Sequence, residues 1–356
     1  MVDAHGTTEL VTLDRLPPEA QLLFSAPQDN LFASLLWWHI VGAYAASAGE
    51  HAACAIVSTD NRISMALPVC CDAKGRMRSS LSSPYNFLCP PVFAPGADIV
   101  ASGRTFGAFC YRYGSVRFDE WPADDPPSMA FIAGVDESGM SVLPFDHFGN
   151  WYEPVEGRSF DDYLAVRPGS LRSTVRRKLR AARQNTHFKL VTGDADLQDG
   201  IDDFAAIYQK SWKQAEPFPE FTENAMRALA SAGLLRLGLL YADEKPIAVQ
   251  FWAVSGGHAQ LHKLAHDERA AALSPGTILT ALMIESLLRE GGIKELDFGR
   301  GDDPYKQLWT SHRRQRIGFI LANRYRPAGI LAIGQARLGS FKRALRGAIQ
   351  TQTEAI

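Results

Sequence analysis

The chain has 356 residues, of which 46% are hydrophobic and 21% are charged, so its composition excludes a disordered or low-complexity protein and its length predicts two domains. No stretch approaches ~18 uninterrupted apolar residues, so the sequence argues against a membrane-spanning helix. The net charge of -2 divides unevenly: residues 1–150 hold 8 basic and 16 acidic side chains, and the remainder is basic, which suits an anionic ligand.

The first half mixes helices and strands without regular alternation. Residues 31–45, "LFASLLWWHIVGAYA", have the apolar spacing of a buried helix. Residues 51–59 and 62–71 predict two strands that form a hairpin through Asp60 and Asn61. The sequence further predicts a proline-rich loop at 82–96, a helix within 96–114, and strands at 115–121 and 140–149.

A strongly basic helix is predicted at residues 168–185, with Ser170 as its N-cap. Leu171, Val175 and Leu179 form one apolar stripe, and no acidic residue occurs in the segment. Its basic residues are Arg172, Arg176, Arg177, Lys178, Arg180 and Arg183. Three hypotheses stay open for this surface. It binds the diphosphate of a nucleotide-linked or polyprenyl-linked sugar, it binds tRNA phosphates, or it is a solvated face.

The second half predicts a regular order of elements. Helices are expected at 200–215 and 222–233, three antiparallel strands at 234–242, 245–255 and 258–266, a helix at 274–292, a strand at 294–299, a short helix at 302–310, a strand at 315–325 and a helical tail from 327. Ser274 is the expected N-cap of the long helix and Pro275 its first residue. A long helix between two neighbouring strands predicts a βαβ unit.

Four motifs occur together in one order: "SLRSTVRRKLRAARQ", the tryptophan of "YQKSW", "HDERAAALSPGTIL" and "LDFGRGDDPYKQLW". Over about residues 160–325 they resemble the FemAB-like branch of the GNAT acyltransferase superfamily, in particular the CelD/BcsL type linked to exopolysaccharide biosynthesis. The resemblance implies an α/β fold with a mixed sheet and two tandem GNAT-like domains. We expect a degenerate first domain at 1–158, the acyltransferase domain at 159–326 and a helical tail at 327–356.

The resemblance also implies a donor site at the start of the long helix. A helix N-terminus presents N–H groups and partial positive charge to a phosphate, so Ser274, Pro275, Gly276 and Thr277 are the expected contacts of acyl-CoA or acetyl-CoA. The junction "RAAALSPG" keeps one glycine where GNAT enzymes are glycine-rich. A longer acyl-CoA, an acyl carrier protein or an aminoacyl-tRNA therefore stays open as the donor, and no metal is expected.

Three catalytic candidates follow the predicted strand at 294–299, and a fourth, His262, lies in the middle of the predicted strand at 258–266. Lys306 resembles a lysine thought to stabilise the oxyanion in FemAB-like enzymes, and Tyr305 is a candidate proton donor. Asp302 is a candidate base or helix cap, and His262 is a base candidate or a structural histidine. Amine acylation also proceeds without a dedicated base, and Trp309 is expected in the core.

Together these features predict a cytoplasmic N-acyltransferase that acylates an amino group of a sugar nucleotide or lipid-linked glycan precursor in exopolysaccharide biosynthesis. The opening residues lack the basic start and apolar centre of a signal peptide, and the five cysteines lack CxxC spacing. The expected acceptor contacts are Arg172, Arg176, Arg180, Trp212 and Arg300.

We expect an anionic sugar-linked acceptor and the polysaccharide-synthesis machinery as partners, and no DNA. Two other functions stay open: an aminoacyl-tRNA-dependent ligase, which would bind tRNA, and a non-catalytic module that binds an anionic nucleotide effector. Weak contact of the basic, amphipathic tail with a membrane surface is a further hypothesis.

Overall fold

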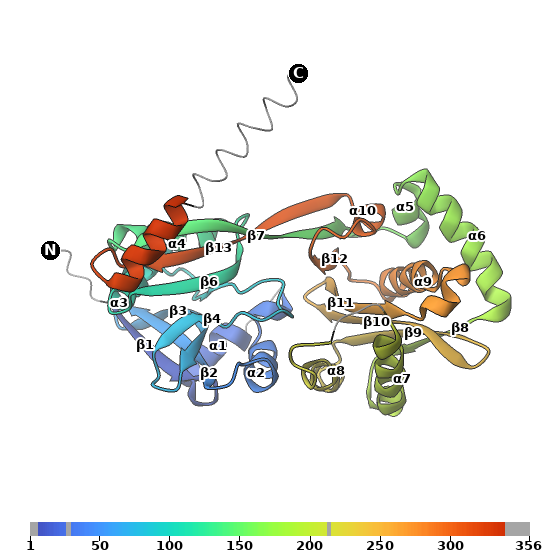
Figure 1. The fold of residues 1–356 in the computed structure, drawn as a ribbon, viewed down its shortest axis with the longest axis horizontal. Coiled ribbons are helices and arrows are strands. Elements are labelled where there is room, and N and C mark those ends of the chain that lie inside the picture. Colours follow the sequence, from blue (N-terminus) through green and yellow to red (C-terminus); the bar gives the residue numbers. More distant parts are fainter. Residues whose placement is uncertain (1–5, 26–29, 212–214, 339–356) are drawn as a thin grey trace, which may run out of the picture. The chain divides into compact units, whose positions relative to one another are not determined.

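The structure is a computed structural model that describes residues 6–25, 30–211 and 215–338 (Figure 1). The chain forms two compact units. Unit 1 takes its described residues from Met1–Phe24, Ala46–His147 and Gln315–Ile356, and unit 2 from Ser25–Ala45 and Phe148–Arg314. The units are therefore discontinuous in sequence and follow other boundaries than the ranges 1–158, 159–326 and 327–356 expected as domains.

Unit 1 contains a mixed sheet. Its strands are β1 (Gly6–Thr12), β2 (Glu50–Thr59), β3 (Arg62–Asp72), β4 (Met77–Ser80), β5 (Val92–Phe93) and β6 (Ser115–Pro122), with parts of β7 (Ser141–Pro154) and β13 (His312–Ala322). The order is β1-β2-β3-β4-β6-β13, with β5 on β3; β4 and β6 are parallel and the other pairs antiparallel. The predicted β2–β3 hairpin is confirmed, because Thr59 pairs with Arg62 and the two residues between them, Asp60 and Asn61, have the positive φ of a tight hairpin turn.

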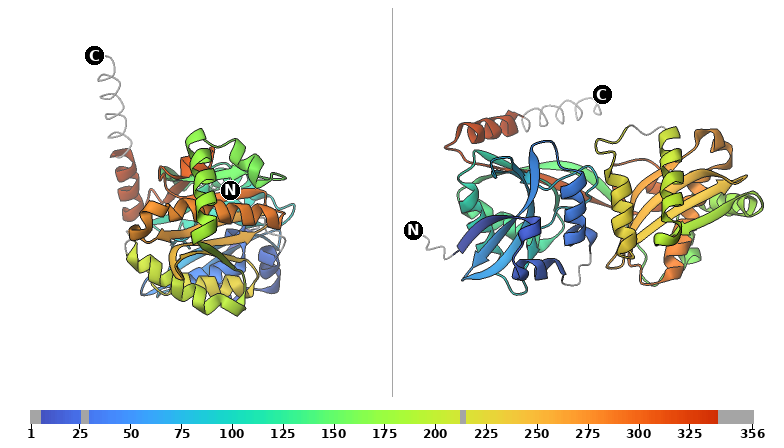
Figure 2. Two further views of the ribbon diagram at one scale, coloured as in Figure 1. Left: turned by 90° about the vertical axis from the view of Figure 1, so that its right-hand side faces the viewer. Right: turned by 90° about the horizontal axis from the view of Figure 1, so that it is seen from below.

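The helices of unit 1 cover an aromatic core. They are η1 (Leu13–Arg15), α1 (Pro18–Ser25, all but its last residue), α3 (Ile99–Cys110), α4 (Pro126–Glu137) and a final helix at residues 327–338. Phe106, Phe118, Trp121 and Phe131 lie in this core, each fully buried. The final helix (red in Figures 1 and 2) confirms the described part of the predicted tail. Residues 339–356 lie outside the described residues.

Unit 2 also contains a mixed sheet, in the order β7-β12-β11-β10-β9-β8. Its strands are β8 (His187–Val191), β9 (Leu235–Ala242), β10 (Lys245–Ser255), β11 (His258–His266) and β12 (Glu295–Arg300), with part of β7. β8 to β11 form antiparallel pairs, whereas β11 and β12 are parallel. The three predicted strands of the meander are confirmed.

Helices cover both faces of this sheet (Figure 1). One face carries α5 (Phe160–Ala165), α6 (Gly169–Asn185) and α9 (Pro275–Glu290); the other carries η2 (Leu31–Ala33), α2 (Leu35–Tyr44), α7 (Leu197–Lys210) and α8 (Phe221–Ser231). The short elements η3 (Asp194–Asp196), η4 (Glu268–Leu273) and α10 (Lys306–Trp309) lie in connections. As predicted, α9 crosses from β11 to the parallel strand β12.

Of the two predicted N-cap residues, Ser274 is found at its position and Ser170 is not. α6 begins at Gly169 after Pro168, so Ser170 is not its N-cap. Ser274 is the N-cap residue of α9, but its side chain makes no capping hydrogen bond, because its backbone is left-handed at φ 59°. None of the described helices is long and apolar enough to cross a membrane.

Candidate active site

The central strands of unit 2 separate after a short paired stretch. β11 and β12 pair only from His258/Glu295 to Gln260/Asp297. Beyond that point β11 continues beside β10, and β12 continues beside β7. The register of β11 against β10 also shifts at His262, which is an extra residue in a β-bulge. The separation opens the sheet at the carboxyl ends of both strands, next to the start of α9.

A cavity of about 450 Å³ lies at this opening. Residues from α6, β11, the α9 start and the segment after β12 line it: Leu171, Leu264, His266, Ala271, Ser274, Pro275, Gly276, Thr277, Thr280, Asp303, Pro304, Tyr305, Leu308 and Trp309. All four predicted donor contacts are among them, as is Tyr305. The structure therefore brings together two motifs that are thirty residues apart in sequence.

Hydrogen bonds fix the first turn of α9 against the sheet. The hydroxyl of Thr280 donates to the carbonyl of Gly276 at 2.8 Å and accepts from the amide of Gln250 at 2.6 Å. The indole N–H of Trp252 then donates to Gln250 Oε1 at 2.8 Å. Pro275 has no N–H, so the free end of the helix presents the amides of Gly276 and Thr277. This fixed, partly positive end suits a phosphate.

Lys306 occupies a different place from the one predicted. It does not line the cavity, and its side chain is only 3% exposed. Its ammonium donates to the carbonyl oxygens of Arg300 and Gly301 and lies 3.1 Å from a carboxylate oxygen of Asp303. The ammonium therefore holds the turn that precedes Tyr305.

Asp302 is held as an anion at the surface. Its carboxylate accepts from Arg313 Nε at 2.7 Å and from the indole N–H of Trp151 at 2.8 Å. The Arg313 hydrogen bond lowers the pKa of Asp302 to about 2. A carboxylate with so low a pKa is a poor proton acceptor, and it does not cap α10, whose N-cap is Tyr305. Both predicted roles of Asp302 are therefore unsupported.

His262 is a core residue. Its ring lies 5.1 Å from those of Trp37 and Phe251 and 6.1 Å from that of Phe32. Burial, with a smaller effect of Lys263, lowers the pKa of His262 to about 3. The imidazole does not line the cavity, so the structure favours the structural alternative over a base. The bulge explains the burial, because it removes His262 from the alternation expected of a regular strand.

His266 is the titratable side chain that sequence reasoning missed. It ends β11, lines the cavity and lies beside Gly276: a Cβ built on Gly276 would be 3.4 Å from His266 Nδ1. Burial lowers its pKa, although Glu268 and Asp267 act in the opposite direction. Its imidazole is therefore neutral near pH 7. The one sequence signal was its place at the strand end, directly before the predicted donor loop.

Tyr305 keeps its proton. Burial raises the pKa of its phenol, and the side chain lines the cavity. The hydroxyl can thus donate a hydrogen bond to an oxygen or sulfur atom there. Trp309 is buried, as expected, and also contributes to the lining.

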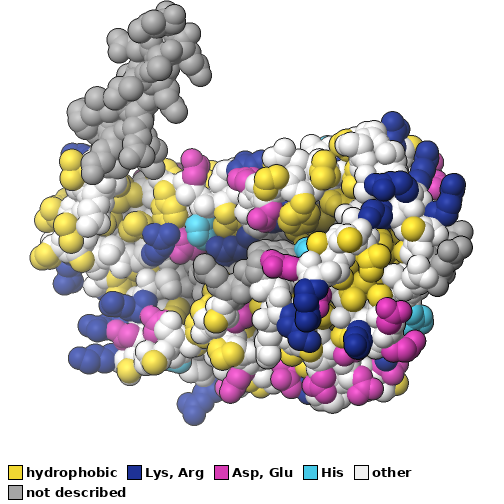
Figure 3. All heavy atoms as spheres, turned by 45° about the vertical axis from the view of Figure 1, so that its right-hand side comes forward, with side chains coloured by type: hydrophobic (Ala, Val, Ile, Leu, Met, Phe, Trp, Pro, Cys, Tyr) yellow, Lys and Arg dark blue, Asp and Glu magenta, His cyan; other side chains and the backbone are white. Residues whose placement is uncertain are grey.

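The predicted acceptor contacts are dispersed. Among the described side chains of α6, only Leu171 lines the cavity. Arg172 donates to the carbonyl of Ala165 at 2.7 Å, while Arg176 and Arg180 are exposed. Figure 3 shows a group of Lys and Arg side chains at the upper right of the view and others spread over the rest of the surface. Arg300 lies over the ring of Phe148 and outside the cavity lining, and Trp212 lies outside the described residues.

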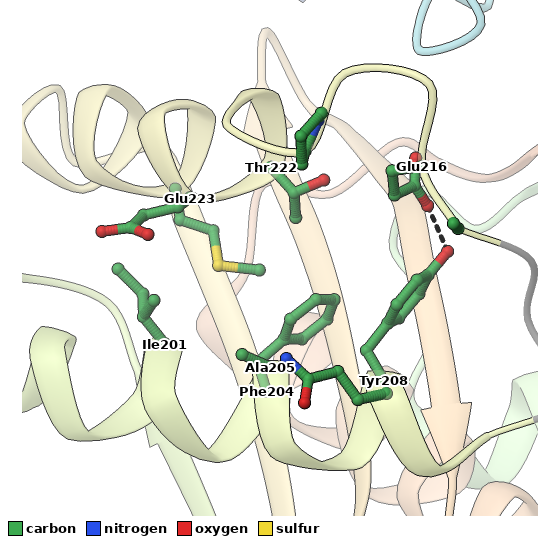
Figure 4. A pocket seen from close by; sticks show the side chains of 11 residues that line it. Ile201, Phe204, Ala205, Tyr208, Glu216, Thr222 and Glu223 are labelled. Atoms are coloured by element: carbon green, nitrogen blue, oxygen red, sulfur yellow. Dashed lines mark hydrogen bonds between the residues drawn. The ribbon is translucent and has the colours of Figure 1, made fainter.

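A second cavity of unit 2, of about 420 Å³, lies between α7 and α8 (Figure 4). Its wall is mainly apolar, from Ile201, Phe204 and Met226. At one end the hydroxyl of Tyr208 donates to Glu216, whose carboxylate also pairs with Lys263 at 2.5 Å. Among the residues that the structure describes, no Lys or Arg side chain lines this cavity, so they offer no cation to a phosphate.

Comparison with known proteins agrees with this geometry. Residues 169–307 match the family described as acetyltransferase (GNAT) domain. No curated protein is significantly similar in sequence. Among the described residues, no group of three or more His, Cys, Asp or Glu side chains is placed to hold a metal ion.

Three solved structures have a similar fold, and this chain aligns with nearly the whole length of each. FemX has a TM-score of 0.58 at 11% identity and covers 89% of this chain and 98% of its own. The C-terminal domain of a putative lysylphosphatidylglycerol synthetase from Agrobacterium fabrum has 0.52 at 12%, covering 88% and 94%. A tandem GNAT protein from the clavulanic acid biosynthesis pathway has 0.51 at 12%, covering 89% and 98%. The chain thus has two tandem GNAT-like domains in a mixed α/β fold.

Proposed function

We propose that this acyltransferase, whose residues 169–307 form a GNAT acetyltransferase domain, moves an acyl group from a coenzyme A thioester to an amine in the 450 Å³ cavity of unit 2. One observation carries the proposal: the cavity joins a fixed helix start at Gly276 to two side chains suited to proton transfer, His266 and Tyr305. Each of the three lies where the strands separate.

The donor's phosphates would bind at the start of α9. The amides of Gly276 and Thr277 and the positive end of the 16-residue helix favour an anion there. The apolar residues Leu171, Leu264 and Leu308 line the same cavity and suit the donor's less polar part. The thioester would then lie toward the strand opening, near Tyr305.

Acyl transfer breaks the thioester C–S bond and forms a C–N bond. The neutral His266 imidazole would accept the proton that the attacking amine loses. The protonated phenol of Tyr305 would donate a hydrogen bond to the developing oxyanion or to the leaving thiolate. Lys306 would act as a positioning residue, because its ammonium fixes the turn that carries Tyr305.

We propose a sugar-linked amine with a diphosphate as the acceptor, within the FemAB-like, CelD/BcsL-type function in exopolysaccharide biosynthesis. The support is the exposed guanidinium groups of α6, above all Arg176 and Arg180, on the helix that also supplies Leu171 to the cavity. Arginine binds phosphates well through its planar, multiply donating group. We place the reaction in the cytoplasm, where nucleotide-linked sugars and acyl-CoA are made.

Replacing Gly276 tests the donor site. A Cβ there makes only an ordinary contact with His266, so Gly276→Leu should fold and fill the cavity. We expect coenzyme A binding, measured by calorimetry, to weaken at least tenfold without a lower melting temperature. Gly193→Leu is the matched control, because a Cβ on Gly193 meets nothing within 4 Å and the residue lies outside the cavity. Unchanged affinity in Gly276→Leu would refute the site.

One observation favours a second candidate, an aminoacyl-tRNA-dependent transferase. The α6 arginines form a row without acidic residues, as a polyanion-binding surface would need. This candidate predicts tRNA binding that weakens steeply with salt and no effect of coenzyme A on the melting temperature. A shift with acetyl-CoA and salt-independent, weak tRNA binding would exclude it.

A further inference from the structure

Unit 1 contains a basic cavity of about 520 Å³, far in sequence from the GNAT domain match. It lies where β4 and β6 begin and the final helix, residues 327–338, packs. Four arginines line it together with tyrosine, small and apolar residues: Arg76, Met77, Arg78, Arg112, Tyr113, Gly114, Ser115, Arg117, Ile320, Ala328, Leu331, Ala332 and Gln335. Among the residues that the structure describes, the lining contains no acidic side chain.

Two of the four arginines are paired with acidic side chains and two are not, as far as the described contacts show. Arg76 is paired with Asp72 at 2.8 Å, and Arg117 binds Asp119 through two nitrogen atoms. The described contacts give Arg78 and Arg112 no acidic partner, and the guanidinium of Arg112 lies over the ring of Phe109. The cavity is therefore positively charged although the first 150 residues are acidic overall.

The final helix is fixed on the mouth of this cavity. A Cβ on Gly114 would lie 2.8 Å from the Cβ of Ala328, and a Cβ on Gly329 would lie 2.6 Å from the carbonyl oxygen of Gly114. The final helix and the chain at Gly114 therefore pack as closely as two backbones allow. Asn323 adds hydrogen bonds, its amide to the carbonyl of Tyr111 at 2.7 Å and its N–H to that of Gly114 at 2.9 Å.

Three apolar side chains of the same helix are exposed. Ile330, Leu331 and Leu338 are 58%, 62% and 63% exposed, and Leu331 also lines the cavity. Figures 1 and 2 show the helix (red) on the outside of unit 1. The sequence after Leu338 continues with basic residues, Lys342, Arg343 and Arg346. Exposed apolar residues beside clustered arginines are typical of a surface that lies on anionic lipid.

We propose that the arginine cavity binds the phosphate of an anionic lipid headgroup while Ile330, Leu331 and Leu338 enter the interface. A guanidinium pair at Arg78 and Arg112 matches a phosphate diester. A soluble phosphate would use the arginines alone, whereas a lipid also accounts for the apolar side chains at the cavity mouth. Unit 1 would thereby hold the enzyme at a membrane surface, independently of the reaction in unit 2.

Vesicle co-sedimentation of the full chain tests this proposal. We expect binding to vesicles of phosphatidylcholine with phosphatidylglycerol and none to phosphatidylcholine alone. Arg78→Glu with Arg112→Glu should lower the partition coefficient at least tenfold, since each basic residue near an anionic surface contributes severalfold. Arg104→Glu is the matched control, because Arg104 is a surface arginine of α3 that does not line the cavity.

Variants of exposed leucines distinguish binding of a lipid from binding of a soluble phosphate. Leu331→Asn should weaken vesicle binding, whereas Leu22→Asn, at an equally exposed leucine of α1, should not. Glycerol phosphate should compete only at far higher concentration than vesicles. The proposal fails if Leu331→Asn binds normally, if glycerol phosphate binds as tightly as the vesicles do, or if the double arginine variant keeps its lipid binding.

Discussion

At the scale of single residues, the chemistry of the site depends on which side chains are already engaged. Lys306 and Asp302 have the charges that a catalytic cation and base need, yet backbone carbonyls hold the first and Arg313 holds the second. His266 and Tyr305 line the cavity with protonation states suited to accepting and donating a proton. Local partners, which a sequence motif does not specify, decide between a catalytic and a structural role.

Lys306→Met should identify which role the ammonium has. Loss of a group that satisfies two carbonyl oxygens should lower the free energy of unfolding by about 1–3 kcal/mol, measured by urea titration. An oxyanion role predicts something different: kcat falls about 10²–10³-fold while stability is unchanged. The second result would restore the catalytic assignment that the sequence suggests.

His266 should appear in the pH dependence of the reaction. Its pKa is lowered below 6.5 by burial, so the imidazole is neutral at pH 7 and becomes protonated only as the pH falls. We expect kcat/KM for a fixed amine to decline on the acid side with an apparent pKa below 6.5. His266→Gln should lower kcat about 10²–10⁴-fold and remove this decline. A decline that persists in His266→Gln would assign it to another group.

At the scale of elements, helix α2, early in the chain, belongs to the unit that contains the candidate active site. Trp37 of α2 is fully buried, and its ring lies 5.8 Å from that of Phe221 in α8 and 5.1 Å from that of His262 in β11. The helix thus covers the face of the sheet opposite α9. A segment about 130 residues before the GNAT domain match contributes to the core of the same unit.

Trp37→Ala should therefore destabilise unit 2. Truncating a fully buried tryptophan costs about 3–5 kcal/mol. Hydrogen exchange should become faster in β10 and β11 and remain unchanged in β2 and β3. Trp121→Ala, in the core of unit 1, is the matched control and should produce the reverse pattern. Faster exchange of β2 and β3 alone in Trp37→Ala would place α2 in the other unit.

At the scale of the whole molecule, the two units differ in their side-chain chemistry. All five cysteines lie in unit 1, where they are buried and form no disulfide. Burial raises the pKa of Cys54 and Cys70 to about 12 and that of Cys71 to about 11. The thiolate is the reactive form, so these thiols are inert while unit 1 is folded.

Thiol labelling should therefore report the opening of unit 1. We expect a thiol-reactive dye to modify fewer than one cysteine per native chain and all five in denaturant. The labelling transition should coincide with the loss of hydrogen-exchange protection in β2 and β3. Rapid modification of the native chain would show that the unit opens locally or that a cysteine is exposed.

Much of the fold follows from the sequence because its signals are local. The apolar alternation and the turns at Asp243–Glu244 and Gly256–Gly257 define β9, β10 and β11 to within a residue, and the proline of "SPG" defines the start of α9. The local patterns do not predict β1, β4, β5, β8, α1, α4 or α5. The strands β1 and β8 form through pairing with β2 and β9, whose residues lie about 40 or more positions away in the sequence.

The sequence by itself determined the type of fold, the order of the central elements and the start of the long helix α9, because periodicity and turn residues act over a few neighbours. Only the tertiary structure decided the rest. A bulge in β11 buries His262, strand separation brings His266 to the start of α9, and the carbonyls of one turn take up the ammonium of Lys306. Burial and hydrogen-bond partners arise from residues far apart in the chain, and these set which groups can act.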